Sequence, residues 1–547
     1  MFNLIHDPWI PILTRSGIRK FIRPADLTEP DDPPISQASV RPDFDGAISQ
    51  WLIGAFQTLA APESDDQWQT ILINPPTRSD IERVLDRPIA NAFNLIEATS
   101  PAFMQDFDPT LGGVGGDARN IGGLLLNSPG GNAAENNSAL FIKIDDGLSV
   151  SLPVAAAMLA TLQINAPSGG VGYRTGIRGG GPLTTLVWPE HRRDHSATTL
   201  FEKIWCNVLP VSHLAPVTTP DRRFPWLIPT RYSTKGETAL DAPDAWNWCF
   251  WATPRPIRLE PPVAEGRCQL DPALPPGPLV TTYRTRNYGN NYPSDKFEHP
   301  LSPYYKVTPV DASKLPMHPG KQSLSYRDWL ALAAGASASD GMDGTRFSAR
   351  VVEAISGSRG RALARHFGAD ISIWAFGFAM DNAKVLAWRE GTLPVFPELP
   401  DDNRLLLRAL ARQMVEAASA AHSALRTALE NAQCALDSEV LYATTEEAFY
   451  AALKNASEGH DVRERWRFTL TKACLTLFES ASSVSDVSGG LATGPRRLLL
   501  GLERKAQAHL ELAKALRIRL TKALGLTTAP KAETEKPAKV QKKGVVK

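Results

Sequence analysis

The chain has 547 residues, and its 59 Lys and Arg residues balance 58 Asp and Glu residues to give a formal net charge of +1 at pH 7. This balance excludes a uniformly basic protein that coats DNA, because such a protein needs a large excess of cations to neutralise phosphates. With 43% hydrophobic and 21% charged residues, the composition is typical of globular proteins, and the length predicts about two to four domains.

The sequence predicts neither export nor membrane insertion. Asp7 and Pro8 stand where a secretory signal would need an unbroken apolar core. No run approaches the roughly 18 apolar residues that a membrane-spanning helix requires. The five cysteines are too few and too scattered for a disulfide framework or a paired-cysteine metal site. We therefore expect a cytoplasmic protein without a membrane segment, a metal site or a cofactor.

Residues 1–400 consist of short apolar runs interrupted by Pro, Gly, Asn and Asp. This pattern predicts short strands, short helices and long connections, and hence a large, irregular N-terminal α+β domain. Residues 108–137 are rich in Gly and Asn, and residues 253–278 are rich in Pro. We expect both stretches to be loops, and loops of that length inside a compact domain are usually functional or disordered.

Residues 166–185 form a glycine-rich segment that contains Arg174 and Arg178. Glycine permits positive φ and lets the backbone approach a ligand closely, while arginine side chains can pair with phosphates. The segment therefore suggests binding of a polyanion. A mobile loop with solvated arginines explains the composition equally well.

Two further segments of this domain are candidates for a binding surface. Arg284 and Arg286 alternate on a predicted strand, which would place both on one face, although a solvated edge strand explains the pattern nearly as well. Residues 371–388 read as two strands joined by a tight turn, because Asp381 and Asn382 tolerate left-handed backbone conformations. An ordinary surface hairpin is the default interpretation of this last pattern.

From about residue 401 the sequence becomes helical in character, because Gly and Pro nearly vanish and Ala, Leu, Glu, Arg and Lys recur at helical spacing. We predict helices over residues 402–436, 444–456, 461–478 and 495–524, which form a C-terminal four-helix bundle over residues 401–525. Thr444 and Glu447 suggest a capping box, Asp461 an N-cap, and Gly525 a C-cap. Residues 526–547 are lysine-rich and predict a disordered basic tail.

No segment carries a recognisable catalytic signature. The sequence lacks a phosphate-binding loop that ends in Lys-Ser/Thr, a Gly-x-Ser-x-Gly elbow and a His-Glu-x-x-His helix. His191 and His195 lie in a polar stretch that is typical of a solvated surface. The alternative function from another class is a hydrolase or transferase with an unrecognised active site around His6, Asp7 or His366.

Five short segments together resemble the CasA-type large subunit of the type I-E CRISPR surveillance complex, Cascade. The resemblance covers nearly the whole chain and rests on FNLIHDPWIP at 2–11, INPP at 73–76, PAFMQ at 101–105, GYRTGIRGGGPLTT at 172–185 and HPLSP at 299–303.

The resemblance implies a non-catalytic subunit of an RNA-guided antiviral defence complex. Such a subunit recognises the protospacer-adjacent motif (PAM) in double-stranded DNA, initiates duplex unwinding and R-loop formation, and helps to recruit a helicase-nuclease. Its other implied partners are the 5′ end of the guide RNA and the backbone, 5′-handle-binding and small subunits. A scaffold that only bridges the guide complex to the nuclease is a further alternative.

The resemblance also implies the residues that contact DNA, namely a glycine loop, a basic side chain, a wedge-like hairpin tip and an aromatic residue. The paired cysteines of many relatives are reduced here to Cys268, which argues against a zinc site, and Asn382 stands where the family usually has glutamine. The implied residues are Gly169, Gly170, Val171 and Gly172 in the loop, with Gly172 facing the groove, Arg284 or Arg286, then Met380, Asp381, Asn382 and Ala383 in the wedge, and Phe141.

Overall fold

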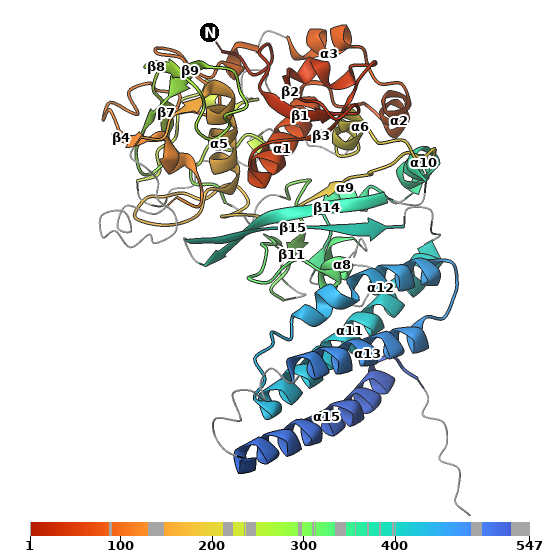
Figure 1. Cartoon of the computed structure of the whole chain (residues 1–547). Coiled ribbons are helices and arrows are strands. Elements are labelled where there is room, and N and C mark those ends of the chain that lie inside the picture. The colour runs from red at the N-terminus through yellow and green to blue at the C-terminus, as the bar shows by residue number, and fades with distance from the viewer. Residues whose placement is uncertain are drawn as a thin grey trace, which may run out of the picture. The chain divides into compact units, whose positions relative to one another are not determined.

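The computed structural model divides the chain into two compact units, Met1–Asp401 and Asp402–Lys547. The first unit mixes helices with small sheets and the second is helical (Figure 1). The α+β fold class followed by an all-α C-terminal region is thereby confirmed. The structure describes residues 2–86, 90–128, 147–211, 223–234, 236, 248–293, 298–308, 311, 313–333, 346–355, 357–368, 371–381, 384–396, 399, 401–482 and 495–526.

The described strands of the first unit form five antiparallel three-stranded sheets, with the orders β2-β1-β3, β4-β10-β7, β12-β11-β13, β15-β14-β6 and β5-β9-β8. Frequent Pro and Gly keep most of these strands short. The strands are β1 (Ile10–Thr14), β2 (Arg19–Ile22), β3 (Pro34–Gln37), β4 (Asp117–Asn120), β5 (Val150–Ser151), β6 (Thr184–Val187), β7 (Ile257–Leu259), β8 (Ala264–Gly266), β9 (Gly277–Val280), β10 (Thr282–Thr285), β11 (Tyr304–Tyr305), β12 (Leu315–Pro316), β13 (Arg346–Phe347), β14 (Ile371–Asp381) and β15 (Lys384–Val395).

Both stretches that we expected to be loops contain regular structure. Residues 108–137 include β4, and residues 253–278 include β7, β8 and the start of β9. The loop prediction is therefore wrong for these parts. Composition misled it, because strands of only three or four residues leave the surrounding Gly, Asn and Pro to dominate the local sequence.

Two long helices, α1 and α5, pack side by side in the first unit (Figure 1). An aromatic cluster surrounds Trp51 of α1, whose ring meets Trp9, Phe93 and Trp251 edge-to-face at centroid distances of 5.0, 5.6 and 6.3 Å. The α-helices of this unit are α1 (Pro42–Leu59), α2 (Asp65–Ile73), α3 (Arg78–Leu85), α5 (Leu152–Asn165), α6 (Leu200–Trp205), α8 (Trp329–Leu332), α9 (Arg350–Glu353) and α10 (Gly357–Phe367). The 3-10 helices are η1 (Pro24–Thr28), η2 (Ala90–Phe93), η3 (Ile121–Leu124), η6 (Pro225–Leu227) and η7 (Tyr326–Asp328).

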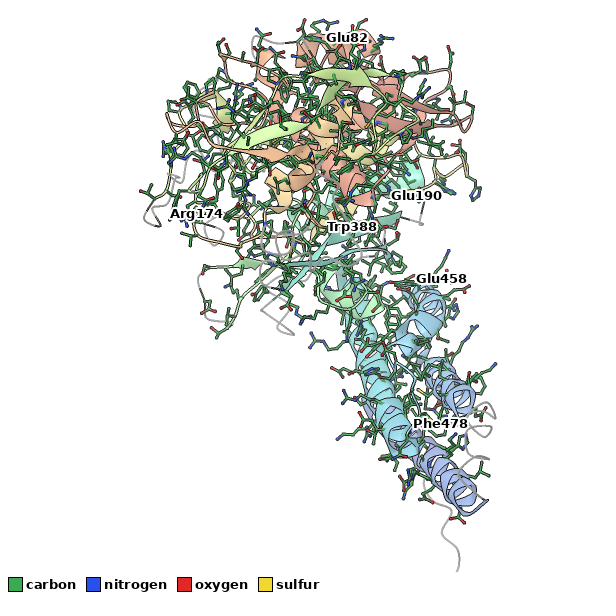
Figure 2. All side chains as sticks on the ribbon, turned by 60° about the vertical axis from the view of Figure 1, so that its left-hand side comes forward. Glu82, Arg174, Glu190, Trp388, Glu458 and Phe478 are labelled. Atoms are coloured by element: carbon green, nitrogen blue, oxygen red, sulfur yellow. The ribbon has the colours of Figure 1, made fainter. Side chains whose placement is uncertain are left out.

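The second unit contains α11 (Asp401–Ala432), α12 (Val440–Ser457), α13 (Arg463–Ala481) and α15 (Pro495–Ala523) among its described residues. Their apolar faces meet in a common core, in which Trp466 Nε1 donates to the Met414 carbonyl oxygen at 2.9 Å and Phe478 is buried (Figure 2). Within the described part of the chain, no helix combines the length and apolar character needed to cross a membrane. Residues 527–547, the predicted tail apart from Leu526, lie outside the described residues.

The helix ends agree only in part with the predicted caps. Gly525 has φ +60°, its N–H donates to the Lys522 carbonyl, and the Leu526 N–H donates to the Thr521 carbonyl, so the C-cap prediction is confirmed as a Schellman motif. The Thr444 capping box is wrong, because α12 begins at Val440 and the Thr444 hydroxyl bonds the Val440 carbonyl within the helix. Asp461 accepts from the Arg463 N–H, but Val462 is the N-cap residue.

A buried carboxylate in α6 accounts for His366, one of the residues suggested for the enzyme alternative. The Glu202 side chain is 1% exposed and accepts hydrogen bonds from His366 Nε2 at 2.7 Å, Arg192 Nε at 2.9 Å and the Thr199 N–H at 2.8 Å. Burial alone would raise its pKa, but these hydrogen bonds together lower the pKa of Glu202 to about 2. His366 thus serves in a structural ion-pair network.

We expect Glu202→Gln to lower the free energy of unfolding at pH 7 by about 2 kcal/mol, because a lowered carboxylate pKa stabilises the folded state wherever the unfolded state would bind more protons. This contribution is complete above the ordinary glutamate pKa of about 4.5 and disappears as the pH falls toward about 2. Urea unfolding of both chains between pH 7 and pH 3 measures the difference, which should shrink with acidity. A difference that stays constant with pH would contradict this account.

Candidate functional site

The glycine-rich segment follows α5 and ends at β6. Its tip is built for positive φ, with Gly169 at +153°, Gly170 at +92° and Gly172 at +79°, and the Tyr173 N–H donates to the Gly170 carbonyl at 3.3 Å. Val171 is 75% exposed at this tip. The other residues of 169–172 are glycines, so apart from this valine the tip presents backbone, which permits a close approach to a ligand.

Gly172 joins this loop to the segment that follows β10. Its carbonyl accepts a hydrogen bond of 2.8 Å from the Tyr288 N–H. A Cβ at position 172 would lie 2.9 Å from the Asn287 Cβ and 3.0 Å from atoms of the Tyr288 ring. Both the backbone angle and the space thus require glycine here, and the structure brings two of the sequence-predicted segments together.

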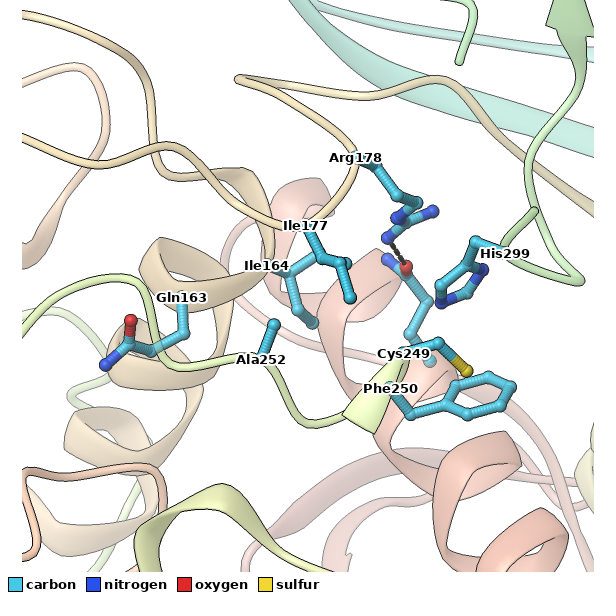
Figure 3. Close-up of a pocket in the computed structure, with 9 residues that line it drawn as sticks. Gln163, Ile164, Ile177, Arg178, Cys249, Phe250, Ala252 and His299 are labelled. Atoms are coloured by element: carbon cyan, nitrogen blue, oxygen red, sulfur yellow. Dashed lines mark hydrogen bonds between the residues drawn. The ribbon is translucent and has the colours of Figure 1, made fainter. Parts of the chain in front are cut away.

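The expectation that Arg174 and Arg178 pair with phosphates is wrong for Arg178. Arg178 is 3% exposed, and its guanidinium donates to Thr184 Oγ1 at 3.0 Å, Ser302 Oγ at 2.9 Å and Gln50 Oε1. Figure 3 shows its side chain beside His299, lining a small cavity. Burial lowers the pKa of Arg178 to about 10. Arg178 is a structural residue of the interior.

Arg174 lies nearer the surface of the first unit (Figure 2), and its side chain contacts residues of two other segments of the same region. Its Nε donates to Ser233 Oγ at 2.8 Å, and its Cζ lies 5.6 Å from the centre of the Tyr288 ring. These contacts fix the base of the glycine loop, so they explain the position of Arg174 without a bound anion.

The strand that carries Arg284 is the central strand of its sheet, between β4 and β7, so the edge-strand alternative is wrong. Arg284 and Arg286 both reach residues 109–115, as alternate residues on one face should. Arg284 donates to the Gly115 carbonyl at 2.7 Å and the Pro109 carbonyl at 3.1 Å, and it forms an ion pair with Glu260.

Arg286 has fewer partners than Arg284. Its Nη1 donates to the Leu111 carbonyl at 2.8 Å, and its Cζ lies 4.0 Å from the centre of the Tyr232 ring. Within the described residues, Arg286 forms no ion pair. Of the two arginines, Arg286 therefore retains more hydrogen-bonding capacity for a ligand.

The predicted hairpin is present as β14 and β15, in which Asp381 pairs with Lys384. Met380 and Asp381 belong to β14, so the connection consists of Asn382 and Ala383, and these two residues lie outside the described residues, as does Phe141. The register shifts by one residue between Ala379 and Met380, because Leu386 of β15 has no partner in β14, and such a bulge increases the local twist. Asp381 is exposed and lies 3.8 Å from Lys321 Nζ.

The end of this hairpin that carries the turn packs against the glycine segment. A Cβ at Gly181 would lie 2.7 Å from Met380 Cε and 2.7 Å from the Phe378 carbonyl oxygen. The strand β14 also pairs with β6, which begins with the last two residues of the glycine-rich segment. The described parts of the three sequence-predicted segments are therefore linked, from residues 284–288 through residues 169–181 to the end of β14.

Sequence reasoning missed Tyr232, Ser233 and Tyr288, which shape this region, and it named the loop of residues 108–116 only as part of the longer stretch 108–137. The available signal was the glycine content of residues 112–116, which predicted a loop but gave no indication of its neighbours.

The other residues considered as metal ligands or catalytic groups do not come together in a site within the part of the chain that the structure describes. No group of three or more His, Cys, Asp or Glu side chains among these residues is placed to hold a metal ion. Cys268 is buried. His6 lies 3.3 Å from Asp86 with both side chains at least half exposed, and Asp7 Oδ2 accepts from the Asn3 N–H.

Comparisons with known proteins give one consistent result. The family model described as CRISPR-associated protein Cse1 matches residues 3–477. The structure is similar to CasA of Thermus thermophilus, with 17% sequence identity, a TM-score of 0.66 and coverage of 94% of this chain and 99% of that chain. Thermobifida fusca Cse1 matches with 18% identity, a TM-score of 0.66 and coverage of 95% and 98%. A chain of a CRISPR RNA-guided surveillance complex matches with 15% identity, a TM-score of 0.63 and coverage of 94% and 99%.

Proposed function

This chain belongs to the CRISPR-associated Cse1 family, and we propose that it is the non-catalytic large subunit of a type I-E Cascade complex. In this role it recognises the PAM in double-stranded DNA, initiates unwinding and R-loop formation, and helps to recruit the helicase-nuclease. Its partners in the complex are the guide RNA near its 5′ end and the backbone, 5′-handle-binding and small subunits.

The observation that carries this proposal is that the glycine tip, which has few side chains, is connected both to the segment that carries Arg286 and to the hairpin of β14 and β15. Gly172 is bonded to Tyr288, two residues beyond Arg286, and Gly181 packs on Met380 at the end of β14. The minor groove is narrow and its hydrogen-bonding pattern is degenerate, so a backbone tip can enter where larger side chains would clash. Contacts in the minor groove therefore suit a PAM of which several sequence variants are accepted.

In this proposal Gly169, Gly170, Val171 and Gly172 contact the groove, Arg286 supplies the basic contact, and Asn382 and Ala383 form the wedge that separates the strands. Disrupting a base step costs a few kcal/mol, which contacts elsewhere must offset. The free energy of pairing between the guide RNA and the target strand nearly balances that of the DNA duplex that it replaces. Small contributions from the protein therefore decide whether the R-loop forms. Phe141 contacts DNA and the guide end, and the C-terminal bundle docks on neighbouring subunits.

The test is the affinity of the guide-loaded complex, with and without this chain, for matched duplexes that carry a permissive or a scrambled flanking motif at one salt concentration. We expect the chain to tighten binding only to the permissive duplex. We expect Asn382→Ala to lower the affinity for that duplex about tenfold. Asn74→Ala, which changes an exposed Asn elsewhere in the first unit, is the control.

Each alternative makes a different forecast. A scaffold would leave the affinity for both duplexes unchanged. A hydrolase or transferase would turn over a substrate as an isolated chain.

A further inference from the structure

We propose that Gly112 and Tyr232 are positioning residues that hold the Arg286 guanidinium toward DNA. This inference rests on the proposed function, because it concerns how the basic contact of that site is presented. A long arginine side chain loses rotamer entropy when it binds, so a preformed position favours binding.

Tyr232 forms one side of the arrangement. Its ring lies under Arg286, with the guanidinium carbon 4.0 Å from the ring centre, and its hydroxyl donates to Asp106 Oδ1 at 2.9 Å. Asp106 is buried, and its main-chain N–H donates to the Ile257 carbonyl in the adjacent strand β7. The ring is therefore fixed at its hydroxyl end while its face is occupied by the arginine.

The loop of residues 108–116 forms the other side. The Asp108 carboxylate accepts from the Thr110 N–H at 2.8 Å, from Thr110 Oγ1 at 2.7 Å and from the Gly112 N–H at 3.0 Å. Leu111 is fully buried and has φ +53°, an uncommon value for a non-glycine residue. In this conformation the Leu111 carbonyl accepts from Arg286 Nη1.

Because Gly112 has no side chain, it leaves room for the Arg286 guanidinium and the Tyr232 ring on which it stacks. A Cβ at this position would be 2.5 Å from Arg286 Nη1 and 2.8 Å from Tyr232 Cε2. Gly113 next to it has φ +79° against +71° for Gly112, yet a Cβ there would meet nothing within 4 Å. The neighbouring glycines thus share the same backbone requirement and differ in their contact with Arg286.

This difference supplies a matched experiment in the full guide-loaded complex. Gly112→Ala and Gly113→Ala introduce the same side chain at similar positive φ. We expect Gly112→Ala to weaken binding to the matched permissive duplex by roughly tenfold and to lower the magnitude of the log-log salt slope by about one, as loss of a phosphate contact does. We expect Gly113→Ala to bind like the unchanged chain.

Coupling to Arg286 separates positioning from a general structural effect. In an Arg286→Gln background, Gly112→Ala should cause no further loss, because the group that it displaces is already gone. Tyr232→Leu should reproduce the loss of affinity, whereas Tyr232→Phe, which keeps the ring, should retain most of the affinity. The two Tyr232 variants also provide the test if Gly112→Ala does not fold.

Two results would overturn the inference: unchanged affinity and salt slope for both Gly112→Ala and Tyr232→Leu, or a further loss from Gly112→Ala in the Arg286→Gln background. If Arg286→Gln alone binds normally while Asn382→Ala loses motif discrimination, only the role of Arg286 and its positioning fails. If motif discrimination survives in all these variants, the proposed function itself fails.

Discussion

Gly172→Asp is expected to reduce the affinity of the guide-loaded complex for a matched permissive duplex at least about hundredfold, toward the level of non-specific binding. Two effects act together. The new side chain collides with Asn287 and Tyr288, whose Cβ and ring atoms lie 2.9 and 3.0 Å from the position of its Cβ. It also brings a negative charge to the tip that is proposed to enter the groove, where phosphates repel it.

The control for this substitution is Gly17→Asp. Gly17 has φ +86° and open space around its Cβ position, so the same residue is introduced at a similar backbone angle away from the proposed site. Affinity is measured by titration at one salt concentration, and thermal unfolding of both variants shows whether the fold persists. A Gly172→Asp complex that still discriminates permissive from scrambled motifs would contradict the role of the glycine tip.

The sequence was most informative where a local pattern has one physical solution. The helical periodicity after residue 401 predicted the bundle, and Gly525 predicted a Schellman end, because only a few residues terminate a helix at positive φ. The alternating arginines predicted a shared face, and Arg284 and Arg286 both reach residues 109–115. These inferences depend on neighbours close in the sequence.

Inferences that depend on distant neighbours were less successful. Arg178 stands in a segment that is rich in glycine, and its burial is set by Gln50 and Ser302, which lie more than 120 positions away. The role inferred for Tyr232 depends on Asp106 and Arg286 in the same manner. Composition and spacing contain no information about such partners, so a site assembled from loops is recognised only after folding places them.

The buried Arg178 provides the second large expected effect, on stability. Arg178→Ala should lower the free energy of unfolding by about 4 kcal/mol, because it removes a buried, hydrogen-bonded charged group and leaves Gln50, Thr184 and Ser302 without that donor in the interior. Arg178→Lys should recover little of this loss, since one ammonium group cannot reproduce the planar arrangement of donors. Thermal unfolding of the full chain measures both variants.

Arg174→Ala is the matched control for this substitution. Arg174 is partly exposed and its side-chain hydrogen bonds go to Ser233, so its loss should cost about 1 kcal/mol. The comparison decides between the two roles considered for Arg178. If Arg178 pairs with phosphate, its substitution leaves the free energy of unfolding unchanged and reduces the salt dependence of DNA binding. If Arg178 is structural, its substitution lowers the unfolding temperature even without DNA. The first outcome would show that Arg178 leaves its buried position to bind nucleic acid.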